Sequence, residues 1–120
     1  MSDKTILVIG TYDTKDDELN YLCDRIRAHG GGVLTMDVSV LGDPSVPTDI
    51  SKHEIATAGG SSIEAAIASE DENTAMQIMA NGAAAKALEL YLADRIHAAI
   101  ILGGSMGTDL ALDVCQALPL

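Results

Sequence analysis

The sequence predicts an α/β fold, a Rossmann-like three-layer sandwich with a parallel sheet whose three strands lie in the order two-one-three. One observation is that apolar runs without polar alternation occur at residues 5–9, 33–38 and 98–102, as is typical of parallel strands covered on both faces. The other is that helical patterns follow these runs. We therefore expect a crevice where the carboxyl ends of the first and third strands meet.

The first helix is expected between Thr14, as its N-cap, and Gly30, where it ends. Three acidic residues in its first turn, 16–18, match the positive end of the helix dipole. Its apolar stripe consists of Leu19, Leu22, Cys23 and Ile26.

Two short helices are expected after the second strand and a proline-containing surface loop at 41–49. Ser51 and Glu54 form a capping box, flanked by Ile50 and Ile55 at the spacing of a hydrophobic staple. Ser61 and Glu64 repeat the capping-box spacing and start the second short helix, which ends near Ala68.

A long helix is expected from Asn73 or Thr74, as its cap, to about Ala93. Gly82 interrupts it at a cost of roughly 1 kcal/mol relative to alanine, so we expect either close backbone packing on the sheet or a bend. The third strand follows, and a closing helix is expected over residues 108–118, before Pro119. The buried stripe of the long helix consists of Met76, Ala80, Ala83, Ala87 and Leu90.

The composition predicts an aliphatic core with reduced thiols. Hydrophobic residues make up 48% of the chain, yet Trp and Phe are absent. Cys23 and Cys115 lack the spacing of a metal or redox motif, so both are expected to be buried thiols. The three histidines are scattered, so no histidine metal site is predicted.

The charge restricts the classes of partner. A formal charge of −11 with only seven Lys and Arg argues against nucleic acid, whose phosphate backbone needs clustered cations. A single nucleotide remains possible, because backbone N–H groups, one lysine and a divalent metal suffice to hold one phosphate chain. The N-terminus lacks a signal-peptide pattern and no apolar run could span a membrane, so a cytoplasmic protein without a membrane partner is expected.

The segment after the third strand, Gly103-Gly104-Ser105-Met106-Gly107-Thr108, has the composition of an anion-binding turn. Its glycines let backbone N–H groups approach a ligand, and the expected helix points its positive end at the same place. A tight turn with a Ser or Thr cap would explain part of the pattern. The segment is not a Walker A loop, because no lysine precedes its final Thr.

A second turn follows the first strand and contains Thr11, Asp13, Thr14 and Lys15. Lys15 is the only cation close in sequence to either turn, although a capped helix start with a solvated lysine is an equally good interpretation. Asp37, at the end of the second strand, lies near the position where a Rossmann acidic side chain meets a ribose hydroxyl. It could equally be a turn residue.

Taken together, three motifs resemble the ATP-binding N-terminal domain family of the tomato mosaic virus resistance protein, over essentially the whole chain. They are Gly10-Thr11-Tyr12-Asp13-Thr14-Lys15, Met36-Asp37-Val38-Ser39-Val40 and Gly103-Gly104-Ser105-Met106-Gly107-Thr108. The resemblance implies a Rossmann-like domain that binds ATP, with or without Mg²⁺, and it implies no reaction. The positions that it marks as nucleotide-binding are Thr11, Asp13, Thr14, Lys15, Asp37, Gly103, Gly104, Ser105, Gly107 and Thr108.

Two alternatives to ATP binding stay open. The segment from Ile101 to Ala111 also looks like the turn that holds NAD pyrophosphate in iron-dependent alcohol dehydrogenases, so the chain could be the NAD-binding half of an enzyme. It could instead be an interaction domain with a vestigial pocket. No catalytic residues can be assigned. Because the third strand would be an apolar edge, we expect residues 1–120 to be the N-terminal part of a longer nucleotide-binding domain, or to form a homo-oligomer.

Overall fold

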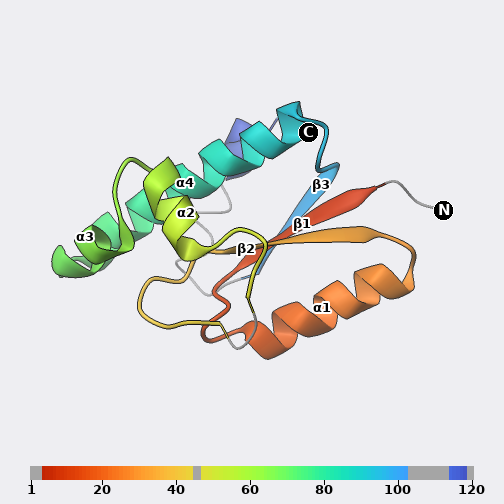
Figure 1. The fold of residues 1–120 in the computed structure, drawn as a ribbon, viewed down its shortest axis with the longest axis horizontal. Coiled ribbons are helices and arrows are strands. Elements are labelled where there is room, and N and C mark those ends of the chain that lie inside the picture. Colours follow the sequence, from red (N-terminus) through yellow and green to blue (C-terminus); the bar gives the residue numbers. More distant parts are fainter. Residues whose placement is uncertain (1–3, 45–46, 103–113, 119–120) are drawn as a thin grey trace.

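The fold is built on a three-stranded parallel sheet (Figure 1). The computed structural model describes residues 4–44, 47–102 and 114–118. Strand β1 (Thr5–Gly10) lies between β2 (Gly32–Asp37) and β3 (Ala98–Leu102) and pairs with both in parallel. The predicted order and strand direction are confirmed, and each strand boundary lies within one residue of its predicted position.

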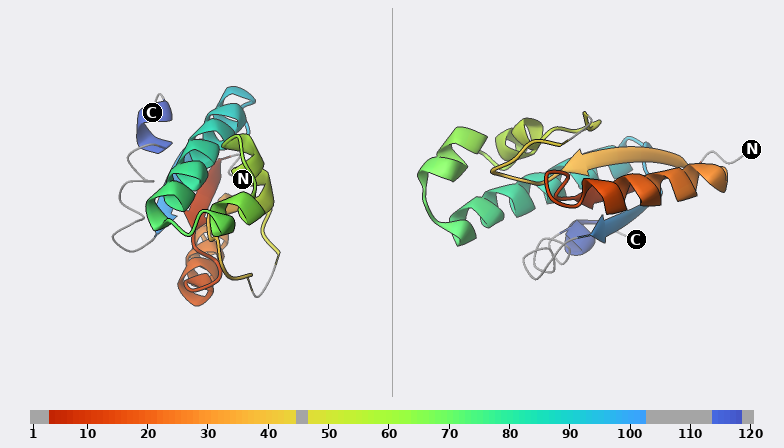
Figure 2. Two further views of the ribbon diagram at one scale, coloured as in Figure 1. Left: turned by 90° about the vertical axis from the view of Figure 1, so that its left-hand side faces the viewer. Right: turned by 90° about the horizontal axis from the view of Figure 1, so that it is seen from below.

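Helices cover both faces of the sheet, which confirms the three layers (Figure 2). Helix α1 (Asp16–Ala28) packs on one face, where Val8 of β1 meets Leu19 and Cys23. On the other face, Leu7 and Ile9 join the apolar cluster formed by the later helices. Those helices are α2 (Lys52–Ala58), α3 (Ile63–Ala68) and α4 (Glu72–Leu92).

The helix caps agree with the prediction at α2 only. The Ser51 hydroxyl oxygen accepts from the Glu54 N–H at 3.2 Å, and Glu54 Oε1 accepts from the Ser51 N–H at 3.5 Å, so the capping box is confirmed. Ile50 and Ile55 are buried in one cluster, as a hydrophobic staple requires.

The other three predicted caps are wrong by one to three residues. Helix α1 has Lys15, not Thr14, as its N-cap, and the Thr14 hydroxyl lies 3.2 Å from that of Thr11. Helix α3 is capped by Ser62, because the Ser61 N–H bonds the Ala56 carbonyl and so belongs to the end of α2. Helix α4 is capped by Asp71 instead of Asn73 or Thr74, and the Asp71 carboxylate accepts from the Asn73 N–H at 3.1 Å.

Of the two predicted explanations for Gly82, close backbone packing and a bend, the structure shows close packing, but the partner is α2 and not the sheet. A Cβ at Gly82 would lie 1.8 Å from the carbonyl oxygen of Ile55, and one at Gly59 would lie 2.3 Å from that of Ile78. The two helices therefore meet backbone to backbone, and glycine is required on each side of the contact.

The two cysteines differ in environment. Cys23 is buried as predicted, whereas Cys115 is exposed, because its neighbour Val114 is the residue that enters the core. Of the predicted closing helix, residues 114–117 are helical, and residues 108–113 lie outside the described residues. None of the helices in the described ranges is both long and apolar enough to cross a membrane.

Candidate functional site

The carboxyl ends of the three strands meet at one edge of the sheet, as Figure 1 shows. Gly10 of β1 pairs with Asp37 of β2 and with Leu102 of β3. From β1 the chain turns to β2 on one side, while β3 lies on the other side, so the topological switch point falls between β1 and β3. Five predicted ligand residues follow Leu102 and lie outside the described residues: Gly103, Gly104, Ser105, Gly107 and Thr108.

The turn between β1 and α1 presents hydroxyl groups and one ammonium group. The Thr11 carbonyl accepts from the N–H groups of Thr14 at 3.2 Å and Lys15 at 2.8 Å, which closes the turn. Thr14 and Lys15 are exposed, and Thr11 is half-buried. The N-cap residue Lys15 makes no side-chain hydrogen bond to the helix, while the Asp16 Oδ1 atom accepts from the Asp17 N–H at 2.9 Å. The turn therefore places the N-terminus of α1 beside the side chains of three predicted ligand residues, Thr11, Thr14 and Lys15.

The buried side chain of Tyr12 fixes this turn to the core. Its side chain is buried and its hydroxyl donates to the Val8 carbonyl at 3.2 Å, beside Leu19 and Cys23. Burial raises the pKa of the Tyr12 hydroxyl far above its ordinary value and also raises the pKa of the Cys23 thiol. Both groups are therefore protonated near neutral pH and act as packing residues.

Asp37 braces the same turn. It is only 1% exposed, and its Oδ1 atom accepts from the Tyr12 N–H at 3.3 Å, from the Ser39 N–H at 2.9 Å and from the Ser39 hydroxyl. Because three protein donors share this oxygen, any ligand contact of Asp37 falls to its other carboxylate oxygen.

Lys52 is a second cation near this edge, and it is not among the predicted site residues. Its Nζ donates to the carbonyl oxygens of Gly42 at 2.7 Å and Val40 at 3.3 Å, and it forms an ion pair with Asp43 at 3.0 Å. The residue is 7% exposed. A lysine one position after a helix cap is normally solvated, so nothing in the sequence indicated this burial.

Asp13 joins the loop held by Lys52 to the first turn. Its Oδ2 atom accepts from the Gly42 N–H at 3.2 Å. Asp13 and Lys52 thus fix residues 40–43 beside the turn, so both act as internal braces.

The charges around the turn are mostly negative, with acidic residues at 13 and 16–18 and one exposed lysine at 15. Within the described ranges, no group of three His, Cys, Asp or Glu side chains is placed to hold a metal ion. Two of the carboxylates, those of Asp13 and Asp37, are held by hydrogen bonds to backbone N–H groups of Gly42 and Tyr12.

Comparison with known proteins gives one family. The family model described as "Uncharacterised protein family (UPF0261) N-terminal domain" matches residues 4–120. Relatives named UPF0261 proteins occur in Brucella suis, 49% identical over 96% of this chain, and in Clostridium tetani, 39% identical over 97%. A third, from Mesorhizobium japonicum, is 36% identical over 98%. The chain spans 28%, 29% and 28% of their respective lengths. No solved structure matches.

Proposed function

We propose a nucleotide-binding function for this chain, which belongs to the UPF0261 family and shares its N-terminal domain. The expected ligand is ATP, bound at the carboxyl edge of the sheet. The observation that carries the proposal is the switch point between β1 and β3, because open parallel α/β sheets bind their ligands there.

The residues of the first turn fit a phosphate chain. Backbone N–H groups at the start of α1 other than that of Asp17, which donates to the Asp16 carboxylate, would bind phosphate oxygens, as helix N-termini do in other nucleotide sites. Lys15 would supply the full positive charge beside them, and the hydroxyls of Thr11 and Thr14 would donate further hydrogen bonds. Asp13 or Asp37 would contact Mg²⁺ or the ribose.

The glycine-rich segment after β3 completes the proposed site. It begins one residue after Leu102, which pairs with Gly10 at the same edge of the sheet. The proposed contacts in this segment are Gly103, Gly104, Ser105, Gly107 and Thr108.

The choice of ATP rests on the resemblance to the ATP-binding family of the tomato mosaic virus resistance protein. Binding of NAD by a dehydrogenase-like half-domain and protein interaction through a vestigial pocket are the competing functions. ATP and NAD both carry linked phosphates, so the relative affinity of the chain for the two nucleotides separates ATP binding from NAD binding. The absence of binding to either nucleotide would favour the third.

Calorimetric titration with ATP and Mg²⁺, and separately with NAD, tests the proposal. We expect ATP to bind more tightly than NAD. Lys15→Ala should weaken ATP binding by about 1.5–3 kcal/mol, or about 10- to 150-fold, because a hydrogen bond to a charged group is lost. The matched control is Lys86→Ala on α4, where the lysine pairs with Glu89, and it should leave the affinity unchanged.

Equal affinity of the wild type and Lys15→Ala, with both folded by circular dichroism, would contradict the role of Lys15. Failure of the wild-type chain to bind ATP would contradict the proposed function itself.

A further inference from the structure

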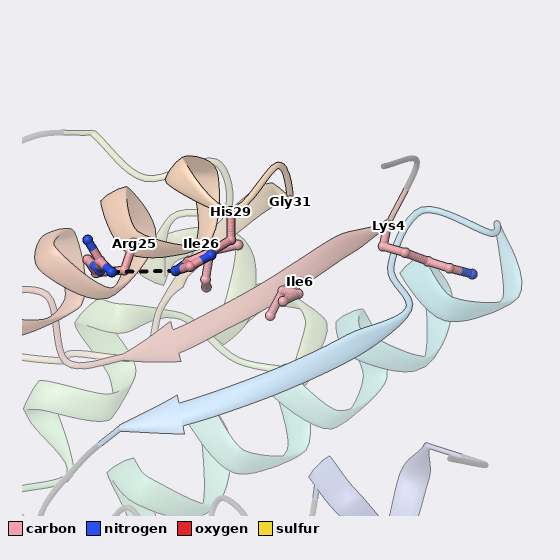
Figure 3. A pocket seen from close by; sticks show the side chains of 6 residues that line it. All are labelled: Lys4, Ile6, Arg25, Ile26, His29 and Gly31. Carbon is pink, nitrogen blue, oxygen red and sulfur yellow. Dashed lines mark hydrogen bonds between the residues drawn. The ribbon is translucent and has the colours of Figure 1, made fainter. Parts of the chain in front are cut away.

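A hollow of about 330 Å³ lies at the opposite end of the molecule from the turn, beside the last turn of α1 and the start of β1 (Figure 3). Its volume is within the range of small-molecule sites. Figure 3 shows Arg25, Ile26 and His29 on α1 and the segment that follows it, and Ile6 on β1. The lining residues are Lys4, Ile6, Arg25, Ile26, His29 and Gly31.

The charge of this hollow is opposite to that of the molecule. The chain has 18 acidic residues against seven Lys and Arg, yet the residues that line the hollow include no carboxylate. Figure 3 shows the Lys4 side chain pointing away from Arg25 and His29, so Arg25 is the cation of the hollow. An arginine without a carboxylate beside it, on a chain of charge −11, favours an anionic occupant.

The floor of the hollow is apolar. Ile6 and Ile26 form it, and both are partly buried against the cluster under α1. A Cβ on Gly31 would lie 2.8 Å from the Ile26 side chain, so bare backbone closes one wall against Ile26. The occupant should therefore have a hydrophobic body as well as a negative charge.

The end of α1 does not oppose an anion as strongly as a free helix C-terminus would. The Arg25 and Ile26 carbonyls accept from the His29 N–H at 3.2 and 3.1 Å, and the Ile26 carbonyl also accepts from the Gly31 N–H at 3.0 Å. With the Gly30 N–H, which donates to the Arg27 carbonyl at 3.0 Å, these contacts occupy three of the last four carbonyl groups of α1.

Arg25 is the group best placed to hold the charge. Its Nη2 lies 3.4 Å from Nε2 of His29, and because a guanidinium can only donate, this nitrogen of the histidine is the acceptor. Among the described residues Arg25 has no carboxylate partner, whereas Arg27 on the same helix pairs with Asp24 at 3.6 Å. The remaining N–H groups of Arg25 suit a carboxylate or sulfonate.

We propose that this hollow binds a small organic anion with a hydrophobic body, such as an aliphatic or aromatic carboxylate or sulfonate. This site is separate from the proposed nucleotide site, and it does not depend on nucleotide binding.

Fluorescence titration with 1-anilinonaphthalene-8-sulfonate tests the proposal, since this probe combines an aromatic body with one negative charge. We expect saturable binding that octanoate displaces, and that neither inorganic phosphate nor ATP with Mg²⁺ displaces. Arg25→Gln should weaken binding at least fivefold. Arg27→Gln, two residues away and outside the lining, is the matched control and should leave it unchanged.

Both arginines are exposed, so neither substitution should unfold the chain. The proposal is overturned if the two variants bind the probe equally, or if phosphate displaces it as well as octanoate does. Displacement by ATP would place the probe in the nucleotide site and would also overturn it.

Discussion

Asp37 is the residue whose role changes most between sequence and structure. The sequence offered a ligand to ribose or a turn residue, and the structure shows a buried carboxylate that holds the backbone of the first turn. A residue can hold a turn in place for a ligand without touching the ligand. The hydrogen bonds of Asp37 therefore support the proposed site, although they occupy one of the two carboxylate oxygens of Asp37.

We predict that Asp37→Ala lowers the free energy of unfolding by about 2–4 kcal/mol, because the Tyr12 and Ser39 N–H groups and the Ser39 hydroxyl lose their acceptor in a buried place. Urea denaturation measures this. The control is Asp43→Ala, whose carboxylate is 85% exposed and pairs with a lysine that retains two carbonyl acceptors, so it should cost at most about 1 kcal/mol. Equal losses in the two variants would contradict the bracing role.

Single residues of the candidate site were only partly predictable. The exposed positions Thr14 and Lys15 follow from a polar turn after an apolar strand. The bracing roles of Asp37 and Asp13 could not be predicted from the sequence, because their hydrogen-bond partners are distant in the chain. Asp37 bonds to Tyr12, 25 residues before it, and Asp13 bonds to Gly42, 29 residues after it. Lys52 is a similar case, since its acceptors are backbone carbonyls of a loop that no side-chain pattern marks.

At the scale of elements, the contact between α2 and α4 depends on glycine. Helix propensity alone would make Gly82→Ala stabilising by about 1 kcal/mol. The Ile55 carbonyl oxygen, 1.8 Å from the position of the added Cβ, reverses this expectation, because the two helices would have to move apart.

We predict that Gly82→Ala lowers the free energy of unfolding by about 1–3 kcal/mol, as overpacking does elsewhere. Asn81→Ala is the control, because residue 81 is exposed on the same helix and the change should stay within about 0.5 kcal/mol. Thermal or urea denaturation of the two variants gives the comparison. A gain of stability in Gly82→Ala would mean that α2 and α4 are not in close backbone contact.

Element boundaries were less predictable than element types. The first and last residues of a helix depend on which side-chain oxygen reaches a free N–H group, and neighbouring hydroxyl residues compete for that place. Ser61 and Ser62 illustrate this competition, since the N–H of Ser61 is already used by α2. The capping box at Ser51 was predictable because both of its partners lie within four residues.

At the scale of the whole molecule, strand order was predictable because the apolar runs allow few arrangements. Three continuous apolar strands separated by helices favour a parallel sheet. The prediction that the turns after the first and third strands share one crevice requires these strands to be neighbours, with the first strand at the centre. The pairing of Gly10 with both Asp37 and Leu102 confirms that β1 is the central strand. The turn after β3 lies outside the described residues.

The two proposed sites occupy opposite ends of the sheet. The nucleotide would bind at the carboxyl edge, where Thr11, Thr14 and Lys15 lie, and the organic anion at the amino edge, beside Arg25 and His29. A method that maps binding along the chain can therefore separate them in one sample.

The most direct test of the central claim is a titration of the ¹⁵N-labelled chain with ATP and Mg²⁺, followed by the amide chemical shifts of each residue. Binding at the switch point predicts that the largest shift changes fall on residues 11–15 and 103–108. The amides of α4 and of Arg25 to Gly31 should remain nearly unchanged. The largest changes at Arg25 to Gly31, or no changes at saturating ATP, would contradict nucleotide binding at the carboxyl edge of the sheet.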